Sequence, residues 1–211
     1  MSTPLRALFL CAILTIAASA FGQVNIVNFD FGAVPVECGS NYAYQGLGSC
    51  SGGPYSPTQN FNQTPGFGWM LGSVVALGEP PFDFGGAGLT GPYSAFCPPS
   101  FDGMPFRQVV FLQSIGSFVA QAVGGFTAGN YTLSFYLGGR CAWGPQRIAA
   151  MIDGNVIGTW DAPPGMPFTL ETATFTVSTD GTHVLKFVGI NPWGDHTAFL
   201  SYVTITRAGD W

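Results

Sequence analysis

Aromatic and polar side chains that could hold a sugar gather in two short stretches of the sequence. Trp143 lies in Cys141-Ala-Trp-Gly-Pro145, and Trp193 lies in Asn191-Pro-Trp-Gly194. Both stretches contain Gly and Pro and are expected to be loops, where an aromatic ring is more exposed than in a strand. A sugar site needs such a ring against the apolar side of a pyranose, with a few polar groups for the hydroxyls. The candidate ligand-binding residues are Tyr136, Arg140, Trp143, Asn191, Trp193 and Asp195.

The alternative for each tryptophan is structural, since large aromatic side chains are mostly buried. Trp143 or Trp193 would then plug the end of the folded domain. Trp160 ends a strand-like segment, and we expect it in the core. Tyr136 remains a candidate because it falls on the polar side of its predicted strand, with Arg140 following soon after.

Residues arranged for catalysis are not evident. Glycoside hydrolysis needs two carboxylates about 5 to 10 Å apart, but Asp102, Asp153 and Asp180 all occur in turn-like stretches. The sequence has no G-x-S-x-G nucleophile motif. Asp195 and His196 are adjacent, which suits a polar loop and does not bring their side chains face to face. We therefore predict no catalytic residues and a protein that is not an enzyme.

Four cysteines follow the N-terminal segment: Cys38, Cys50, Cys97 and Cys141. An even number in an exported chain indicates two disulfides, for which three pairings exist. We favour Cys38 with Cys50 and Cys97 with Cys141, on proximity alone. A zinc site is the other possibility, but the sequence has no CxxC pair and both histidines lie far downstream. No metal site is predicted.

Residues 1–20 have the features of a secretory signal peptide. Arg6 supplies the positive charge, residues 7–17 are apolar, and Ala18-Ser-Ala20 is a small-x-small cleavage site, so the mature chain is expected to begin at Phe21. A membrane anchor is the alternative, but the apolar stretch is much shorter than the roughly 20 residues of a spanning helix. We predict a secreted or periplasmic protein whose mature form does not insert into membranes.

The composition narrows the range of partners. The 211 residues include six Lys or Arg and eleven Asp or Glu, which gives a formal net charge of −5 at pH 7. Such a chain lacks the positive patch that binds nucleic acid or acidic membranes. Its hydrophobic share of 47% argues against disorder. We predict one domain, residues 21–211.

From residue 108 onward the sequence predicts a ladder of β-strands. Short segments rich in β-branched and aromatic residues alternate with Gly, Pro, Asn or Asp. The segments are 108–112, 117–123, 131–137, 147–152, 156–160, 170–177, 184–188 and 198–205. Asp153-Gly154 is typical of a tight hairpin turn, because Gly accepts a positive φ. The ladder predicts an all-β antiparallel jelly-roll sandwich.

The first half of the sequence differs from this ladder in composition. Residues 24–31 alternate and predict a first strand, whereas about 32–105 is dense in Gly, Pro, Asn and Ser. One strand is expected there at Gly68-Trp-Met-Leu71, extending as far as Leu77. The segment contains no charged or low-complexity linker, so we assign it to the same domain as a loop-rich part.

A spaced set of residues runs through the ladder: Gln121, Val123, Ala128-Gly-x-Tyr131-x-Leu133-x-Phe135, Arg140, Ile152-Asp-Gly154, Phe175-x-Val177, His183-x-Leu185-x-Phe187 and Thr197-Ala-Phe199. This set resembles the galactose-binding-like jelly-roll domains of secreted bacterial proteins and plant cell-wall proteins. It covers about residues 108–206, with further matches at 27–31 and Trp69. The resemblance implies a β-sandwich, and many members of the family bind carbohydrate.

That family often holds a structural calcium ion with one acidic residue just after the first strand and another in the last strand. The corresponding positions here are Gly32 and Ser201. A hard cation loses its strongest ligands without carboxylates. We therefore predict no cofactor, although Asp30 lies close by.

Three classes of function predict three kinds of surface. The first expectation is a secreted, non-catalytic, lectin-like carbohydrate-binding module, with Trp143 or Trp193 exposed beside Arg140 in a groove. A structural or adhesive extracellular protein that binds protein or matrix predicts a broad apolar patch. A polysaccharide-acting enzyme predicts two close carboxylates in a pocket.

Overall fold

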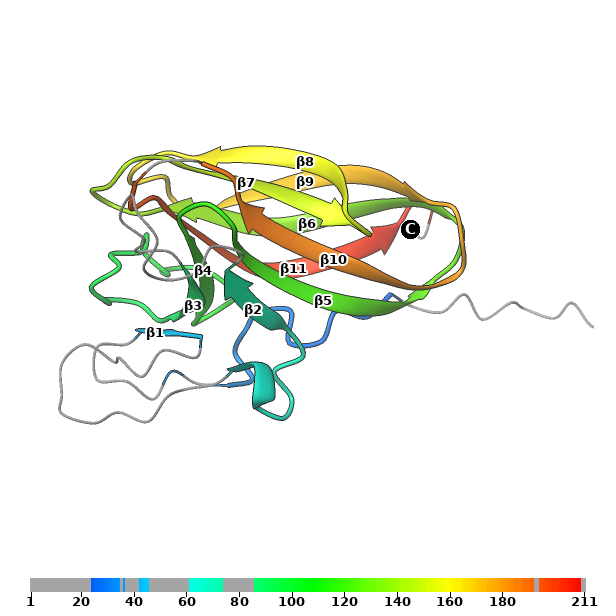
Figure 1. The fold of residues 1–211 in the computed structure, drawn as a ribbon, viewed down its shortest axis with the longest axis horizontal. Helices are drawn as coiled ribbons and strands as arrows, with labels where there is room; N and C mark the ends of the chain where they lie inside the picture. The colour runs from blue at the N-terminus through cyan, green and yellow to red at the C-terminus, as the bar shows by residue number, and fades with distance from the viewer. Residues whose placement is uncertain are drawn as a thin grey trace, which may run out of the picture.

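The computed structural model describes residues 24–34, 36, 42–45, 61–73, 86–191 and 194–209. In this part of the chain, eleven strands form two antiparallel sheets that pack face to face (Figure 1). The helical structure there is a 3-10 turn at Phe61–Gln63, and none of it could cross a membrane. The antiparallel β-sandwich predicted from the sequence is confirmed.

The six-stranded sheet has the order β1-β3-β4-β11-β6-β9, and the five-stranded sheet has the order β2-β5-β10-β7-β8. The first contains β1 (Tyr42–Tyr44), β3 (Gly86–Thr90), β4 (Val109–Gln113), β6 (Gly129–Gly139), β9 (Thr169–Val177) and β11 (Thr197–Arg207). The second contains β2 (Met70–Ser73), β5 (Ser117–Phe126), β7 (Gln146–Ile152), β8 (Asn155–Ala162) and β10 (Gly181–Gly189).

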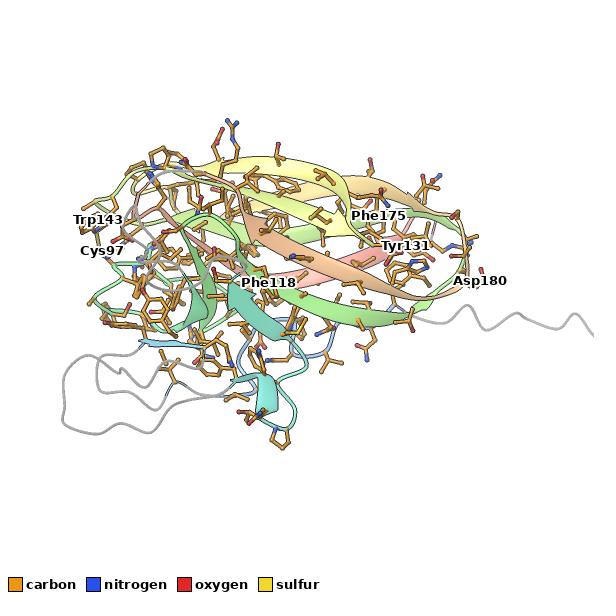
Figure 2. The ribbon with its side chains drawn as sticks, viewed as in Figure 1. Cys97, Phe118, Tyr131, Trp143, Phe175 and Asp180 are labelled. Carbon is orange, nitrogen blue, oxygen red and sulfur yellow. A yellow bond between two sulfur atoms is a disulfide. The ribbon has the colours of Figure 1, made fainter. Side chains whose placement is uncertain are left out.

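From β4 onward, the connections between strands gather at two opposite ends of the sandwich. The hairpin end contains residues 127–128, 153–154 and 178–180. The loop end contains residues 114–116, 140–145, 163–168 and the described parts of 190–196. Trp143 and Asp180 mark these two ends in Figure 2, where Cys97 also lies at the loop end.

The core between the sheets follows from alternation along each strand. In β6, Tyr131, Leu133, Phe135 and Leu137 are fully buried, whereas the residues between them are partly exposed. Phe135 makes an edge contact with Phe187 of β10, with ring centroids 4.9 Å apart, and so joins the two sheets. Phe135 also contacts Trp160, which packs against the core as expected.

A second aromatic cluster covers the outer face of the six-stranded sheet. Phe96, Phe101 and Phe106 from the connection 91–108 pack with Phe111 of β4 and Phe199 of β11. Phe96 stacks on Phe111 with ring centroids 4.3 Å apart. The long connection from β3 to β4 is therefore held by aromatic burial, although it contains no strand or helix of its own.

Buried glutamine side chains attach the N-terminal segment to the sheets. The Gln108 amide donates to the carbonyl oxygens of Phe31 and Val34, at 2.6 and 2.8 Å. Gln121 hydrogen bonds to both the N–H and the carbonyl of Val27. Each glutamine supplies the donors and acceptors that a neighbouring strand would otherwise supply.

Two strand predictions for the first half of the sequence are wrong, the first entirely and the second at its boundary. Residues 24–31 form turns and irregular structure, not a strand, because Asn28 and Phe31 have φ angles of 50° and 57°. The strand expected at Gly68–Leu71 is present as β2, but it begins at Met70 and not at Gly68, whose φ is 73°. Residues 1–20, the Cys38 and Cys50 pair and the possible extension to Leu77 lie outside the described residues.

Candidate functional site

The loop end is built on the last residues of β6. A Cβ atom on Gly139 would collide with the carbonyl oxygen of Pro163, so only glycine lets the 163–168 loop pass over this strand end. The carbonyl of Arg140 accepts a hydrogen bond from the N–H of Gly165 at 2.8 Å. These contacts fix the backbone from which the Arg140 side chain extends.

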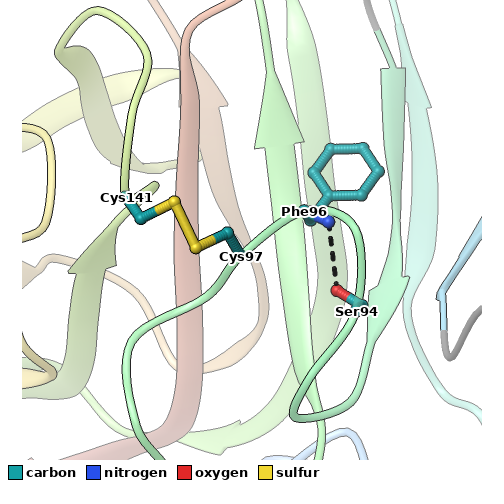
Figure 3. The surroundings of a disulfide bond; sticks show 4 residues. All are labelled: Ser94, Phe96, Cys97 and Cys141. Atoms are coloured by element: carbon teal, nitrogen blue, oxygen red, sulfur yellow. Dashed lines mark hydrogen bonds between the residues drawn. A yellow bond between two sulfur atoms is a disulfide. The ribbon is translucent and has the colours of Figure 1, made fainter.

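A disulfide between Cys97 and Cys141 joins this strand end to the connection 91–108, with their Cα atoms 5.6 Å apart (Figure 3). This is the pairing favoured from the sequence. Ser94 shapes the turn before Cys97, because its hydroxyl accepts the N–H of Phe96 and its carbonyl accepts the N–H of Cys97. The cross-link thus keeps Phe96 close to Arg140.

The Arg140 guanidinium lies against two aromatic rings and faces a carboxylate. Its central carbon is 4.9 Å from the ring centroid of Phe96 and 4.8 Å from that of Trp143. Its Nη1 donates to both carboxylate oxygens of Asp195, at 2.9 and 3.0 Å. The two charged side chains are only 11% and 20% exposed, so water screens this ion pair weakly.

Hydrogen bonds continue from Asp195 into the six-stranded sheet. The Gln113 amide donates to Asp195, and the Tyr44 hydroxyl donates to the Gln113 carbonyl oxygen. Burial raises the pKa of Tyr44, and the charge of Asp195 raises it further. Tyr44 therefore stays neutral and keeps its donor proton at physiological pH.

A cavity of about 170 Å³ opens beside the ion pair. Its lining consists of Tyr42, Tyr44, Ala95, Phe96, Gln113, Arg140 and Asp195. Aromatic rings next to one cation, one carboxylate and one amide suit a neutral ligand that carries hydroxyl groups. Asp195 is the only carboxylate among these lining residues, so the two-carboxylate arrangement of a glycosidase is not assembled here.

Buried polar atoms without partners concentrate at the loop end. In the described part of the chain these side-chain atoms are Arg140 Nε, His196 Nδ1 and Thr197 Oγ1. The His196 ring packs against Gly144, where a Cβ would collide with it. Because buried polar atoms are nearly always paired, three such atoms in two adjacent loops and the first residue of β11 distinguish this end from the rest of the described fold.

Gln146 holds the loop end from within the sandwich. Its fully buried amide nitrogen faces the carbonyl oxygens of Ser114 and His196, at 3.2 and 3.1 Å. Its carbonyl oxygen accepts the N–H of Asn191 at 3.3 Å. One side chain therefore fixes the positions of two different loops.

The structure brings together three of the six predicted site residues: Arg140, Trp143 and Asp195. Asn191 lies nearby, where its amide nitrogen donates to the carbonyl of Pro145 and joins the two loops. Trp143 is 50% exposed, which suits a ligand contact better than a plug. Trp193 lies outside the described residues.

Tyr136 is placed elsewhere. It is half-buried in the aromatic cluster on the outer face of the sheet, with its ring centroid 5.6 Å from that of Phe106 and 6.2 Å from that of Tyr202. The prediction that Tyr136 points away from the core between the sheets is correct, but the connection 91–108 covers that outer face.

Five lining residues were not anticipated: Tyr42, Tyr44, Ala95, Phe96 and Gln113. Tyr42-Ala-Tyr44 alternates aromatic and small residues, which is a signal for a short strand. Nothing in the sequence indicates that this strand pairs with β3 and so reaches Arg140.

The region in which the resembling family ligates calcium is held by hydrogen bonds within the chain. The Ser201 hydroxyl lies 3.1 Å from the carbonyl oxygen of Asp30 and 3.2 Å from that of Gln108. The Asp30 carboxylate accepts the N–H of Gly32 at 3.1 Å. The Gln108 amide points its N–H groups at two other carbonyl oxygens of the same turn, as described above. A cation would have to displace these donors, so the residues present do not fit calcium.

No family model and no curated protein matches the sequence. Among solved structures, the chain is similar to a Stig cyclase from Fischerella sp. TAU in complex with (3Z)-3-(1-methyl-2-pyrrolidinylidene)-3H-indole. The identity is 15%, the match covers 88% of this chain and 98% of that one, and the TM-score is 0.54. This likeness shows a shared fold.

Two carbohydrate-binding structures match smaller parts of the molecule. The CBM22-1–GH10 modules of an endo-1,4-beta-D-xylanase from Clostridium thermocellum, complexed with xylohexaose, match at 16% identity over 67% of this chain and 26% of that chain, with a TM-score of 0.46. The carbohydrate-binding module CBM36, in complex with calcium and xylotriose, matches at 17% identity over 49% of this chain and 84% of that one, with a TM-score of 0.39.

Proposed function

We propose that the protein is a secreted, non-catalytic carbohydrate-binding protein whose loop end receives the glycan. The observation that carries this proposal is the half-exposed Trp143 ring, stacked on a guanidinium that is locked to Asp195 beside a polar and aromatic cavity. The ring offers apolar surface to one side of a sugar. The cavity offers donors and acceptors for hydroxyl groups.

Preorganisation supports the same assignment. Arg140 and Asp195 are already ordered by each other, by Phe96 and by Gln113. A ligand therefore does not have to immobilise these side chains, which lowers the entropic cost of binding. The signal-peptide features and the disulfide are consistent with an extracellular location.

The test uses oxidised protein, residues 21–211, and a panel of xylan, cellulose, chitin, galactan and mixed-linkage glucan. Pull-down on the insoluble members and tryptophan fluorescence on the soluble members both report binding. We expect saturable binding that Trp143→Ala reduces at least tenfold. Leu170→Ala is the matched control, because this β9 side chain is similarly exposed, at 54%. Folded protein that binds no member of the panel would contradict the proposal.

The two alternatives have less support. A structural or adhesive protein would use a broad apolar patch, but on the five-stranded sheet the exposed Met70, Val156 and Val184 lie on β2, β8 and β10, no two of which are neighbours. A polysaccharide-acting enzyme of the glycosidase kind would need a second carboxylate beside Asp195, and the described lining of the cavity offers none.

We also propose that the fold needs no calcium, because Gln108 and Ser201 hydrogen bond to the turn at residues 30–34 and hold it in place. Excess EDTA should then leave the melting temperature unchanged. A fall in the melting temperature that calcium chloride reverses would contradict this.

A further inference from the structure

A second and larger cavity, of about 480 Å³, lies in the connection 91–108, which supplies all of its described lining. Tyr93, Pro98, Pro99, Phe101, Asp102 and Arg107 are among the residues that form it. Ser94 and Cys97 also contribute, and the same short stretch places Phe96 in the cavity beside Arg140. One cross-linked turn therefore separates two cavities.

Tyr93 is the most exposed large apolar side chain in the described part of the chain, and it is one of seven non-glycine residues there with a positive φ. Its side chain is 96% exposed, although its ring is largely apolar. Its φ is 63°, in the left-handed region that a bulky side chain rarely adopts. Neither burial nor backbone preference explains a tyrosine here, and strained residues of this kind concentrate at binding sites.

Two charged groups accompany the ring in this cavity. The Ser100 hydroxyl donates to Asp102 at 2.8 Å and accepts the Asp102 N–H at 3.1 Å, which fixes the direction of the carboxylate. Arg107 is exposed and makes no hydrogen bond or ion pair with the described part of the chain. One carboxylate and one guanidinium leave the cavity without net charge, so they favour a neutral ligand with hydroxyl groups over an anionic one.

We infer that this cavity is a second sugar subsite, which takes one neutral pyranose unit of the bound glycan. The inference rests on the proposed function. The Tyr93 ring and the neighbouring prolines contact the apolar face of the sugar, and Asp102 and Arg107 hydrogen bond to its hydroxyls. The disulfide and the buried Phe101 hold the turn, so the subsite is largely formed before binding.

The test is titration calorimetry with xylohexaose, cellohexaose, laminarihexaose and tri-galacturonate. Tyr93→Asn removes the ring, and Asn tolerates the left-handed conformation, so this variant should keep the melting temperature of the wild type. Tyr93→Phe keeps the ring and is the matched control. For the neutral hexaose that binds the wild type, Tyr93→Asn should weaken affinity about fivefold to tenfold, Arg107→Gln should weaken it several-fold, and Tyr93→Phe should weaken it less than twofold.

The possible results separate the two proposals. Affinity that is unchanged in Tyr93→Asn but reduced in Trp143→Ala would overturn the second subsite and leave the loop-end site in place. Tighter binding of tri-galacturonate than of any neutral hexaose would overturn the assignment to a neutral sugar. If none of these oligosaccharides binds the wild type, the second subsite is overturned, whereas the loop-end site is overturned only if the polysaccharide panel also shows no binding.

Discussion

The same strands form both ends of the sandwich, but the connections between strands differ at the two ends. At the hairpin end the turns are short and their polar groups are paired. The Asp153 carboxylate accepts the N–H of Val184, and the Asp180 carboxylate accepts the N–H of Ala128. At the loop end three of the four connections that follow β4 are longer, two cavities open nearby, and the three unpartnered buried polar atoms of the described residues are found.

This contrast separates the end that closes the sheets with short turns from the end that would contact a ligand under the proposed function. Turns such as Asp153-Gly154 join neighbouring strands with few residues, and the Asp153 carboxylate is already paired with the Val184 N–H and with His183. Loops on a rigid scaffold can present side chains such as Trp143 without disturbing the core. Such loops need further contacts to hold their backbone in place. At the loop end, Gln146 and the disulfide provide these contacts.

The largest effect is expected on removing the cross-link of the loop end. Cys97→Ala/Cys141→Ala opens a loop with a sequence separation of 44 residues. The chain-entropy relation gives a loss of about 4 kcal/mol in the free energy of unfolding. Urea denaturation measures the loss. Glycan affinity should fall as well, because Phe96 and the loop that bears Trp143 are no longer held together.

The double alanine variant isolates this bond, whereas a reducing agent would also reduce any disulfide between Cys38 and Cys50. If the variant keeps both its stability and its glycan affinity, the disulfide is not what organises the loop end.

A smaller effect is expected from the Arg140–Asp195 ion pair. A double-mutant cycle with alanine at both positions should give a coupling energy of about 1–2 kcal/mol, because both side chains are largely shielded from water. The pair Arg147–Asp161 is the control, with side chains 56% and 58% exposed. Its coupling should be much weaker and should disappear at high salt. Equal coupling for the two pairs would argue against a special role for Arg140.

The smallest effect is expected at the hairpin end, from His183. Its Nδ1 faces the Asp153 carboxylate and its Nε2 faces the Thr179 carbonyl, so the protonated ring can donate to both oxygens. These contacts, the Asp153 hydrogen bond first, raise the pKa of His183 above its usual value. Hydrogen bonds from His183 and from the Val184 N–H lower the pKa of Asp153.

The direction of the pH dependence follows from these two shifts. The His183 contribution is complete below about pH 6.5 and is lost as the pH rises through the raised pKa. The Asp153 contribution is present above about pH 4 and is lost as the pH falls through the lowered pKa. Between pH 6 and pH 9, the free energy of unfolding should fall more for the wild type than for His183→Gln, by less than about 1 kcal/mol because Asp153 is partly exposed. Glycan affinity should not change between these two proteins.

The strand ladder was predictable because its sequence carries the information locally. Strands such as β6 alternate between buried and exposed positions, and Asp153-Gly154 has the positive φ angles, 49° and 82°, that its hairpin turn requires. By contrast, β3 reads Gly-Ala-Gly-Leu-Thr, which has low strand propensity. Gly88 is required there because a Cβ would collide with Ala43 and Phe111, and that contact is visible only in three dimensions.

The candidate site was predictable to a similar extent. Arg140, Trp143 and Asp195 flank β6 and β11, which are adjacent strands, so loops next to them in the sequence also meet in space. Gln113 reaches the same place because β4 pairs with β11, and Tyr44 reaches it through the pairing of β1 with β3 and of β3 with β4. The strand prediction for residues 24–31 was wrong although their pattern alternates. The pattern does not reveal that the backbone there hydrogen bonds to side chains and not to a neighbouring strand.

The most direct test of the central claim is to map the bound glycan on the molecule. The oligosaccharide with the highest affinity would be titrated into ¹⁵N-labelled, oxidised protein while amide chemical shifts are followed. The account predicts that the largest shifts occur at residues 42–45, 93–102, 140–145 and 194–196, with the turns at 127–128, 153–154 and 178–180 unaffected. Shifts confined to those turns, or to the exposed strand faces, would contradict a binding site at the loop end.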